Sequence, residues 1–109
     1  MSKETLTRPE TSSSPRALPA HEPLVHVVLL DDDEHTYEYV VRMLCTLFSY
    51  SVREAFAMAR EVDTTGRVVV ATTHRERAEL KCEQIAGFGP DPLVATSHGS
   101  MRARIEPCA

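Results

Sequence analysis

The chain of 109 residues has no tryptophan and no long apolar run, although 42 % of its residues are hydrophobic. Because a membrane-spanning helix requires roughly 18 consecutive apolar residues, we expect a soluble protein that does not enter a membrane. The N-terminal stretch MSKETLTRPETSSSPRALPAHEP lacks the apolar centre of a secretory signal, which favours a cytoplasmic location. A chain of this length is sufficient for one domain with one core, so a single small site is the most to expect.

Sequence signatures of catalysis and of structural metal sites are also missing. The chain contains no glycine-rich phosphate loop, no HExxH and no GxSxG, so we expect neither an enzyme nor a cofactor. Its three cysteines, Cys45, Cys82 and Cys108, lack CxxC spacing, which argues against a disulfide framework and a zinc site. We expect Cys45 and Cys82 to pack as small hydrophobic side chains. The formal net charge of −4 argues against a general nucleic-acid binder.

The chain does contain a concentrated acidic segment. Asp31, Asp32, Asp33 and Glu34 are consecutive and follow an apolar run, whereas the arginines are scattered through the second half. A local negative potential of this kind favours a positively charged ligand. The residues alone leave three alternatives open: a metal held by the carboxylates and His35, a favourable interaction of the acids with a helix N-terminus, or a bound ammonium group.

The apolar pattern divides the chain into an extension and one domain. Residues 1–23 contain four prolines and a serine run, and we expect them to form a flexible N-terminal extension to a core domain at 24–109. The β-branched apolar stretches LVHVVLL at 24–30 and RVVVATT at 67–73 predict two strands.

Three stretches have the apolar spacing of helices. The first is predicted at about 36–48, with Thr36 able to cap it. A tight corner at Ser49 and Ser51 leads to the second helix, which ends at Gly66. Its apolar stripe consists of Val52, Ala55, Phe56, Ala59 and Val62. The third helix is marked by Ala78, Cys82, Ile85 and Ala86 and is closed by Gly87 and Gly89.

Two weaker β-prone pieces, 93–97 and 100–106, follow the third helix and surround a candidate hairpin turn at His98-Gly99. The order βααβαββ predicts an α+β fold, in which three helices cover one face of a small antiparallel sheet. That sheet has three strands, with an extra C-terminal strand if both pieces join it.

The stretch VVLLDDDEHTYEYVVRMLCTLFSYSVREA resembles the first half of the ClpS family, the adaptors that deliver N-end-rule substrates to a ClpA-type or ClpC-type AAA+ unfoldase and its ClpP protease. The family pattern there is approximately V-x-L-x-N-D-D-x-x-T/P-x-x-x-V-V, followed by an FSY-like corner between two helices. The stretch GRVVVATTHRERAELKCEQI resembles the second strand and third helix of the family, so the resemblance spans about residues 24–97. It implies a ClpS-like adaptor that is monomeric and has no catalytic activity.

The resemblance further implies recognition of a free N-terminus that carries a bulky apolar first side chain. In the family an Asn and an Asp of the loop and a His at the end of the second helix hold the α-ammonium of the substrate, and the corresponding residues here are Asp31, Asp32 and Asp63. Two of these depart from the pattern, because Asp31 replaces the Asn and Asp63 replaces the His. The additional carboxylates strengthen the attraction for an ammonium group but raise the cost of an empty site.

The apolar side of this pocket is implied to consist of Leu29, Tyr37, Val40 and Val62, with His35 at its rim. Tyr37 stands where the family commonly has a methionine. Its rigid ring is less adaptable than a thioether, which affects the choice of first residue.

A second surface is implied on the third helix. Glu76 and Lys81 match family positions that contact the N-terminal domain of the unfoldase, and Glu79 lies between them. The extension at 1–23 resembles in kind the flexible family segment that engages the unfoldase. The alternative is a divergent relative that docks on the unfoldase without degron binding, and the three departures from the family pattern support it.

Overall fold

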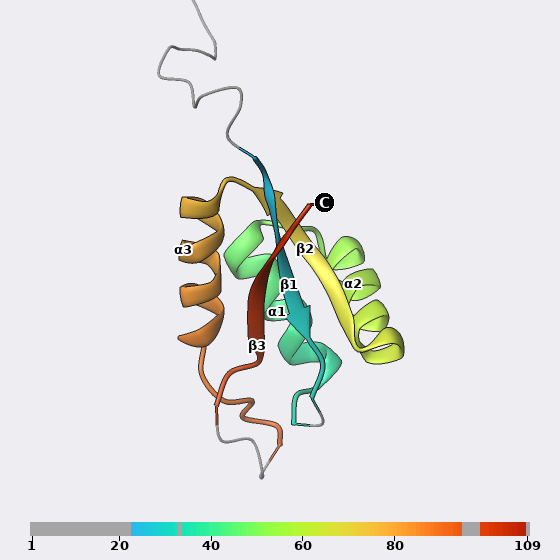
Figure 1. The fold of residues 1–109 in the computed structure, drawn as a ribbon. Helices are drawn as coiled ribbons and strands as arrows, with labels where there is room; N and C mark the ends of the chain where they lie inside the picture. The colour runs from blue at the N-terminus through green and yellow to red at the C-terminus, as the bar shows by residue number, and fades with distance from the viewer. Residues whose placement is uncertain (1–22, 33, 95–98, 109) are drawn as a thin grey trace, which may run out of the picture.

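The computed structural model describes residues 23–32, 34–94 and 99–108, so the expected N-terminal extension lies, except for Pro23, outside the described residues. The described residues form three helices and one three-stranded antiparallel sheet, which confirms the predicted α+β fold (Figure 1). The elements in chain order are β1 (Val25–Leu30), α1 (Tyr37–Phe48), α2 (Val52–Thr65), β2 (Arg67–Thr73), α3 (Arg75–Ala86) and β3 (Arg102–Pro107).

Strand β1 is the centre of the sheet, with β2 on one side and β3 on the other. Its last residue, Leu30, pairs with Arg67 of β2 and with Arg102 of β3. The three central residues of β1 have no exposed surface, which is why this strand is apolar almost throughout. The acidic segment therefore begins where a fully paired, buried strand ends.

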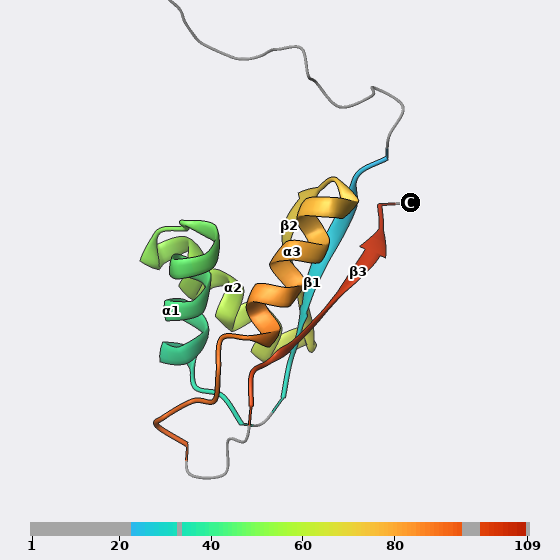
Figure 2. The same cartoon turned by 90° about the vertical axis from the view of Figure 1, so that its left-hand side faces the viewer.

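The three helices lie on the same side of the sheet (Figure 2). Apolar side chains of this layer and of the covered sheet face form one hydrophobic core, whose largest members include Tyr39, Leu29, Met43, Leu44 and Ile85. Cys45 and Cys82 are partly buried and pack against this core, as expected, and both are free thiols. Among the described residues, none of the helices has the length and apolar character that crossing a membrane requires.

Local hydrogen bonds explain where the first two helices begin and end. The side chain of Thr36 accepts a hydrogen bond from the Tyr39 N–H, which confirms the predicted N-cap of α1. Ser49 ends α1 with a left-handed backbone (φ 60°). Ser51 then starts α2 through a capping box with Glu54. The predicted corner between two helices is thus a left-handed residue followed by a capping box.

The C-terminal part of the sheet differs from the prediction. The expected strand at 93–97 is wrong in its described part, because residues 92–93 form a turn, and 95–97 lie outside the described residues. The carboxylate of Asp91 accepts a hydrogen bond from the Leu93 N–H at 2.9 Å, and such a side-chain contact favours a turn over a strand. The second expected strand exists as β3, but its partner is β1 and not a neighbouring hairpin strand.

Candidate functional site

The first aspartate of the acidic segment is fixed to the end of α2. The backbone N–H of Asp31 donates a hydrogen bond of 3.0 Å to the carbonyl oxygen of Gly66. Gly66 ends α2 with a φ of 91°, a backbone conformation that favours glycine, and its own N–H donates to the Val62 carbonyl. The loop that leaves β1 and the last turn of α2, which carries Asp63, are therefore neighbours.

Tyr37 joins the start of α1 to the end of α2. Its hydroxyl donates a hydrogen bond of 2.8 Å to Oδ2 of Asp63. This hydrogen bond raises the pKa of Tyr37, and burial and the negative charges of Asp63 and Asp31 act in the same direction, whereas Arg60 opposes them. The phenol consequently stays neutral and donates. The predicted site residues Asp31, Tyr37 and Asp63 are thus brought together by the fold.

The predicted site residue Asp32 makes a different set of contacts. Its Oδ1 accepts a hydrogen bond of 2.9 Å from the Glu34 N–H and lies 2.7 Å from Nδ1 of His35. The other ring nitrogen of His35, Nε2, lies 2.8 Å from the carbonyl oxygen of Gly99. The His35 side chain is only 2 % exposed, so its ring lies inside the loop and not at an open rim.

The predicted apolar wall consists mainly of core residues. Leu29, Val40 and Val62 are 0 %, 4 % and 2 % exposed and belong to the hydrophobic core beneath the acidic segment. Tyr37 is partly exposed, and its ring meets the ring of Phe56 edge to face, with 5.4 Å between the centroids. Whether the three buried side chains line a pocket stays a prediction.

Phe56 is a site neighbour that sequence reasoning missed. The helical period placed Phe56 in the apolar stripe of α2, yet 43 % of this residue is exposed. It packs between the ring of Tyr37 and the guanidinium group of Arg60, whose carbon lies 5.9 Å from the Phe56 ring centroid. The position of an exposed aromatic pair next to Asp63 depends on which residue of α1 faces α2, and periodicity does not provide that information.

Two of the alternatives for the acidic segment can be compared with the structure. The described residues contain no group of three or more His, Cys, Asp or Glu side chains that is placed to hold a metal ion, and Asp33 lies outside them. The acidic residue in the first turn of α1 is Glu38, because the helix begins only at Tyr37. The described residues thus offer no such metal group, and binding of an ammonium group by the acidic segment stays a prediction.

The predicted docking residues lie on α3, and they differ in exposure. Glu76 and Glu79 are exposed and, together with Leu80, line a groove of about 460 Å³. Lys81 is only 9 % exposed. Its Nζ donates to the carbonyl oxygen of Leu47 and lies 5.1 Å from the ring centroid of Phe48. Burial lowers the pKa of Lys81, and the neighbouring Arg77 adds to this effect.

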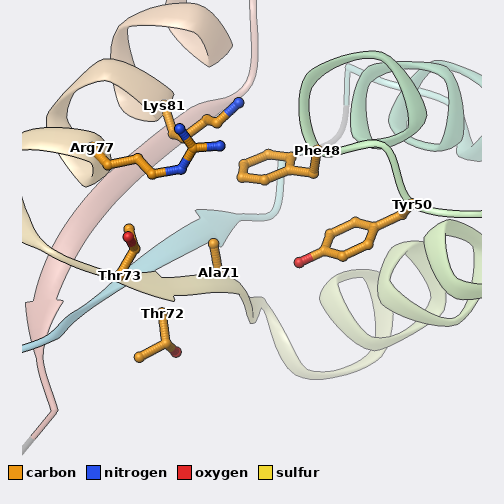
Figure 3. A pocket seen from close by; sticks show the side chains of 7 residues that line it. All are labelled: Phe48, Tyr50, Ala71, Thr72, Thr73, Arg77 and Lys81. Atoms are coloured by element: carbon orange, nitrogen blue, oxygen red, sulfur yellow. The ribbon is translucent and has the colours of Figure 1, made fainter. Parts of the chain in front are cut away.

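A second hollow lies on the other side of Arg77. Figure 3 shows Arg77 and Lys81 reaching from α3 toward Phe48 at the end of α1, with the end of β2 below them. The pocket has a volume of about 280 Å³ and is lined by Phe48, Tyr50, Ala71, Thr72, Thr73, Arg77 and Lys81. Arg77, which the sequence analysis did not select, lines both hollows and is therefore the central cation of this surface.

Comparisons with known proteins agree with this fold. Residues 20–96 match the family described as ATP-dependent Clp protease adaptor protein ClpS. The ClpS adapter of Synechococcus elongatus is 34 % identical over 90 residues, which cover 82 % of this chain and 90 % of that protein. The ClpS adapter of Desulforapulum autotrophicum is 30 % identical over 82 residues, which cover 75 % and 79 %.

A solved structure extends the likeness to three dimensions. Agrobacterium tumefaciens ClpS2 bound to L-phenylalaninamide superimposes with a TM-score of 0.69 at 25 % identity, covering 80 % of this chain and 99 % of that one. The fold and these matches define the class of protein as an adaptor of an ATP-dependent Clp protease. The chain belongs to the ClpS family, which confirms the resemblance seen in the sequence.

Proposed function

We propose that this adaptor binds proteins with a free N-terminus and a bulky apolar first residue, and that it delivers them to a Clp AAA+ unfoldase without catalysis of its own. The observation that carries the proposal is that the Tyr37 hydroxyl donates to Asp63 at the end of α2, while Gly66, which ends α2, holds the backbone of Asp31. The L-phenylalaninamide bound to Agrobacterium tumefaciens ClpS2 supports it, because that ligand combines a free α-amine with a benzyl side chain.

The chemistry of the site suits an α-ammonium group. An ammonium has three N–H donors, and charge-assisted hydrogen bonds to carboxylates are roughly twice as strong as neutral ones. Asp63 supplies a carboxylate at the Tyr37 hydroxyl, and Asp31 and Asp32 supply two more on the loop after β1. A single bound ammonium would relieve the repulsion between these charges, which an empty site leaves uncompensated.

The first side chain of the substrate would lie beside the ammonium, against the aromatic pair. The rings of Tyr37 and Phe56 are partly exposed and edge to face, which gives a bulky apolar or aromatic side chain a favourable surface. Burial of such a side chain contributes roughly 1.5–3 kcal/mol, while N-terminal charge recognition provides the specificity for a chain end.

For unfoldase docking we propose the exposed face of α3. Glu76 and Glu79 surround the half-exposed Leu80, and Arg77 separates this groove from the pocket above Lys81. An apolar side chain within a rim of mixed charge is the usual composition of a protein interface. The partner would be the N-terminal domain of a ClpA-type or ClpC-type unfoldase.

One observation favours the alternative, a ClpS-like module that docks without degron binding. The Tyr37 hydroxyl already donates a hydrogen bond to Oδ2 of Asp63. Asp63 stands at the position where the family pattern has a histidine. The ammonium group of a ligand would either share this carboxylate with the Tyr37 hydroxyl or displace the hydroxyl from it.

A titration separates the two functions. The isolated protein is titrated, at about pH 6.5, with a peptide that begins with Phe and with the same peptide N-acetylated, since the free α-amine is then protonated. Because acetylation removes the ammonium, we expect micromolar or tighter binding of the free amine and at least about 100-fold weaker binding of the acetylated peptide. Equal affinity for both peptides would contradict degron recognition, and no binding of either with intact docking would favour the alternative.

A further inference from the structure

His35 is held from both sides by hydrogen-bond acceptors. Its Nδ1 lies 2.7 Å from the carboxylate of Asp32, and its Nε2 lies 2.8 Å from the carbonyl oxygen of Gly99. Both ring nitrogens are thus in contact with oxygen atoms, one from the loop itself and one from the segment before β3. The side chain that makes these two contacts is 2 % exposed.

The ring is also fixed by its neighbours on α1. It lies 4.5 Å from the ring of Tyr39, which is 1 % exposed and donates from its hydroxyl to the carbonyl oxygen of Gly89. Asp32 receives a second hydrogen bond from the Glu34 N–H, so the loop between β1 and α1 closes on itself around one carboxylate oxygen. These contacts connect His35 both to Asp32 and to α1.

The segment between α3 and β3 completes the arrangement from outside. The carboxylate of Asp91 is 2 % exposed and accepts hydrogen bonds of 2.7 Å and 2.9 Å from the N–H and the hydroxyl of Thr36. Gly89, Asp91 and Gly99 thus all contact the start of α1 or the loop before it. In Figure 2 the two connections meet at the lower end of the molecule.

We propose that His35 is a positioning residue of the degron site: through its two ring nitrogens it orients Asp32 and holds the β1–α1 loop on the α3–β3 connection. The inference rests on the proposed function and adds to it a role for one further residue. Adjacent carboxylates repel each other and would otherwise spread, and a site that is ordered in advance loses less entropy when it binds. His35 thereby fixes the positions from which the loop presents its carboxylates to an ammonium group.

Two amide substitutions separate the two contacts of the ring. His35→Asn places an amide N–H near the position of Nδ1 and retains the contact with Asp32, whereas His35→Gln reaches the position of Nε2 and retains only the contact with Gly99. If orientation of Asp32 is the important role, we expect H35N to keep affinity for the Phe-initiated peptide within about threefold, and H35Q to lose about tenfold. A purely structural role would not produce this order at equal thermal stability.

A matched control is available on β1. His26 contacts Thr72 through its Nδ1, at 2.9 Å, on an exposed part of the sheet remote from the acidic segment. His26→Gln removes the same type of ring, and we expect it to leave the peptide affinity unchanged. Equal losses in H26Q and H35Q would overturn the positioning role.

A further measurement uses the unaltered protein, so its result does not depend on whether a variant folds. Nuclear Overhauser contacts between the protons of the His35 ring and those of Tyr39 and Gly99 are expected, because the ring packs on Tyr39 and contacts the Gly99 carbonyl. Their absence would overturn the inference. If the unaltered protein binds the free-amine peptide and H35Q binds it equally well, the positioning role fails and the proposed function stands; if the unaltered protein binds no free-amine peptide, the proposed function fails and takes the inference with it.

Discussion

At the scale of single residues, the candidate site depends on one hydroxyl that donates to a carboxylate of the neighbouring helix. Tyr37 donates to Asp63 and is close enough to Asp31 for that charge to raise its pKa. The identities of Asp31 and Asp63 as site residues came from the family resemblance, and the fold supplies their proximity. The contact between His35 and Gly99 could not be predicted, because 64 positions separate the two residues and no pattern in either segment refers to the other.

The charge of Asp63 can be tested without removing its hydrogen bond. Asp63→Asn retains an oxygen that accepts from Tyr37 but loses the negative charge. Because one charge-assisted contact to the ammonium is lost, we expect about tenfold weaker binding of a Phe-initiated peptide, measured by calorimetric titration, with little change in thermal stability. The matched control is Glu61→Gln, which removes the same charge from an exposed residue of α2. A loss in E61Q as large as that in D63N would attribute the effect to overall charge.

At the scale of elements, the start of α1 is stabilised from a distant part of the chain. Burial raises the pKa of Asp91, but hydrogen bonds from Thr36 and from the Leu93 N–H outweigh burial, so the pKa is lowered overall. A carboxylate at a helix N-terminus also interacts favourably with the helix dipole. The sequence predicted the bounds of the first two helices well, since Thr36, Ser51 and Gly66 are local signals, and it predicted the end of the third at Gly87. The strand predicted near Asp91 is wrong, because β propensity does not take account of the side-chain hydrogen bonds that produce the turn.

The lowered pKa of Asp91 predicts a pH-dependent contribution to stability. A group whose pKa is lower in the folded state stabilises the fold above its unfolded pKa of about 3.9, and this contribution is lost as the pH falls through the folded value. We therefore expect Asp91→Asn to lower the free energy of unfolding by about 2 kcal/mol at pH 7, because its hydrogen bonds lose their charge. Urea denaturation at pH 7, 5 and 3 should show this difference narrowing toward the lowest pH.

The control for Asp91 is Glu83→Gln, which neutralises an exposed carboxylate on α3. We expect this variant to unfold at nearly the same urea concentration as the unaltered protein at all three pH values. A difference between D91N and the unaltered protein that does not change with pH would show that charge is not the reason for the stabilisation.

At the scale of the whole molecule, the two surfaces lie at opposite ends of β2. Arg67, the first residue of β2, follows Gly66, which holds Asp31, whereas Thr72 and Thr73 at the other end line the pocket between β2 and α3. Neither surface includes a residue of the other. If the proposed function is correct, this arrangement lets substrate and unfoldase bind at the same time.

This separation predicts that docking can be lost without loss of substrate binding. Arg77→Glu reverses the central charge of the α3 surface, and we expect about tenfold weaker binding to the N-terminal domain of a ClpA-type or ClpC-type unfoldase, measured by surface plasmon resonance. The affinity for the Phe-initiated peptide should remain unchanged. Arg53→Glu, on the exposed side of α2, is the matched control and should retain both activities. Equal docking by R77E and R53E would argue against α3 as the docking surface.

Gly66 affects which substitutions this site can accept during evolution. Its left-handed backbone ends α2, and its carbonyl oxygen holds Asp31, so one main-chain position determines how far apart the side chains at 31 and 63 stand. Because this spacing is independent of the side chains themselves, a neutral amide, an imidazole or a carboxylate can occupy either position without moving the other. Under the proposed function, the charge presented to a chain end can therefore change from one relative to another while the backbone that carries it stays the same.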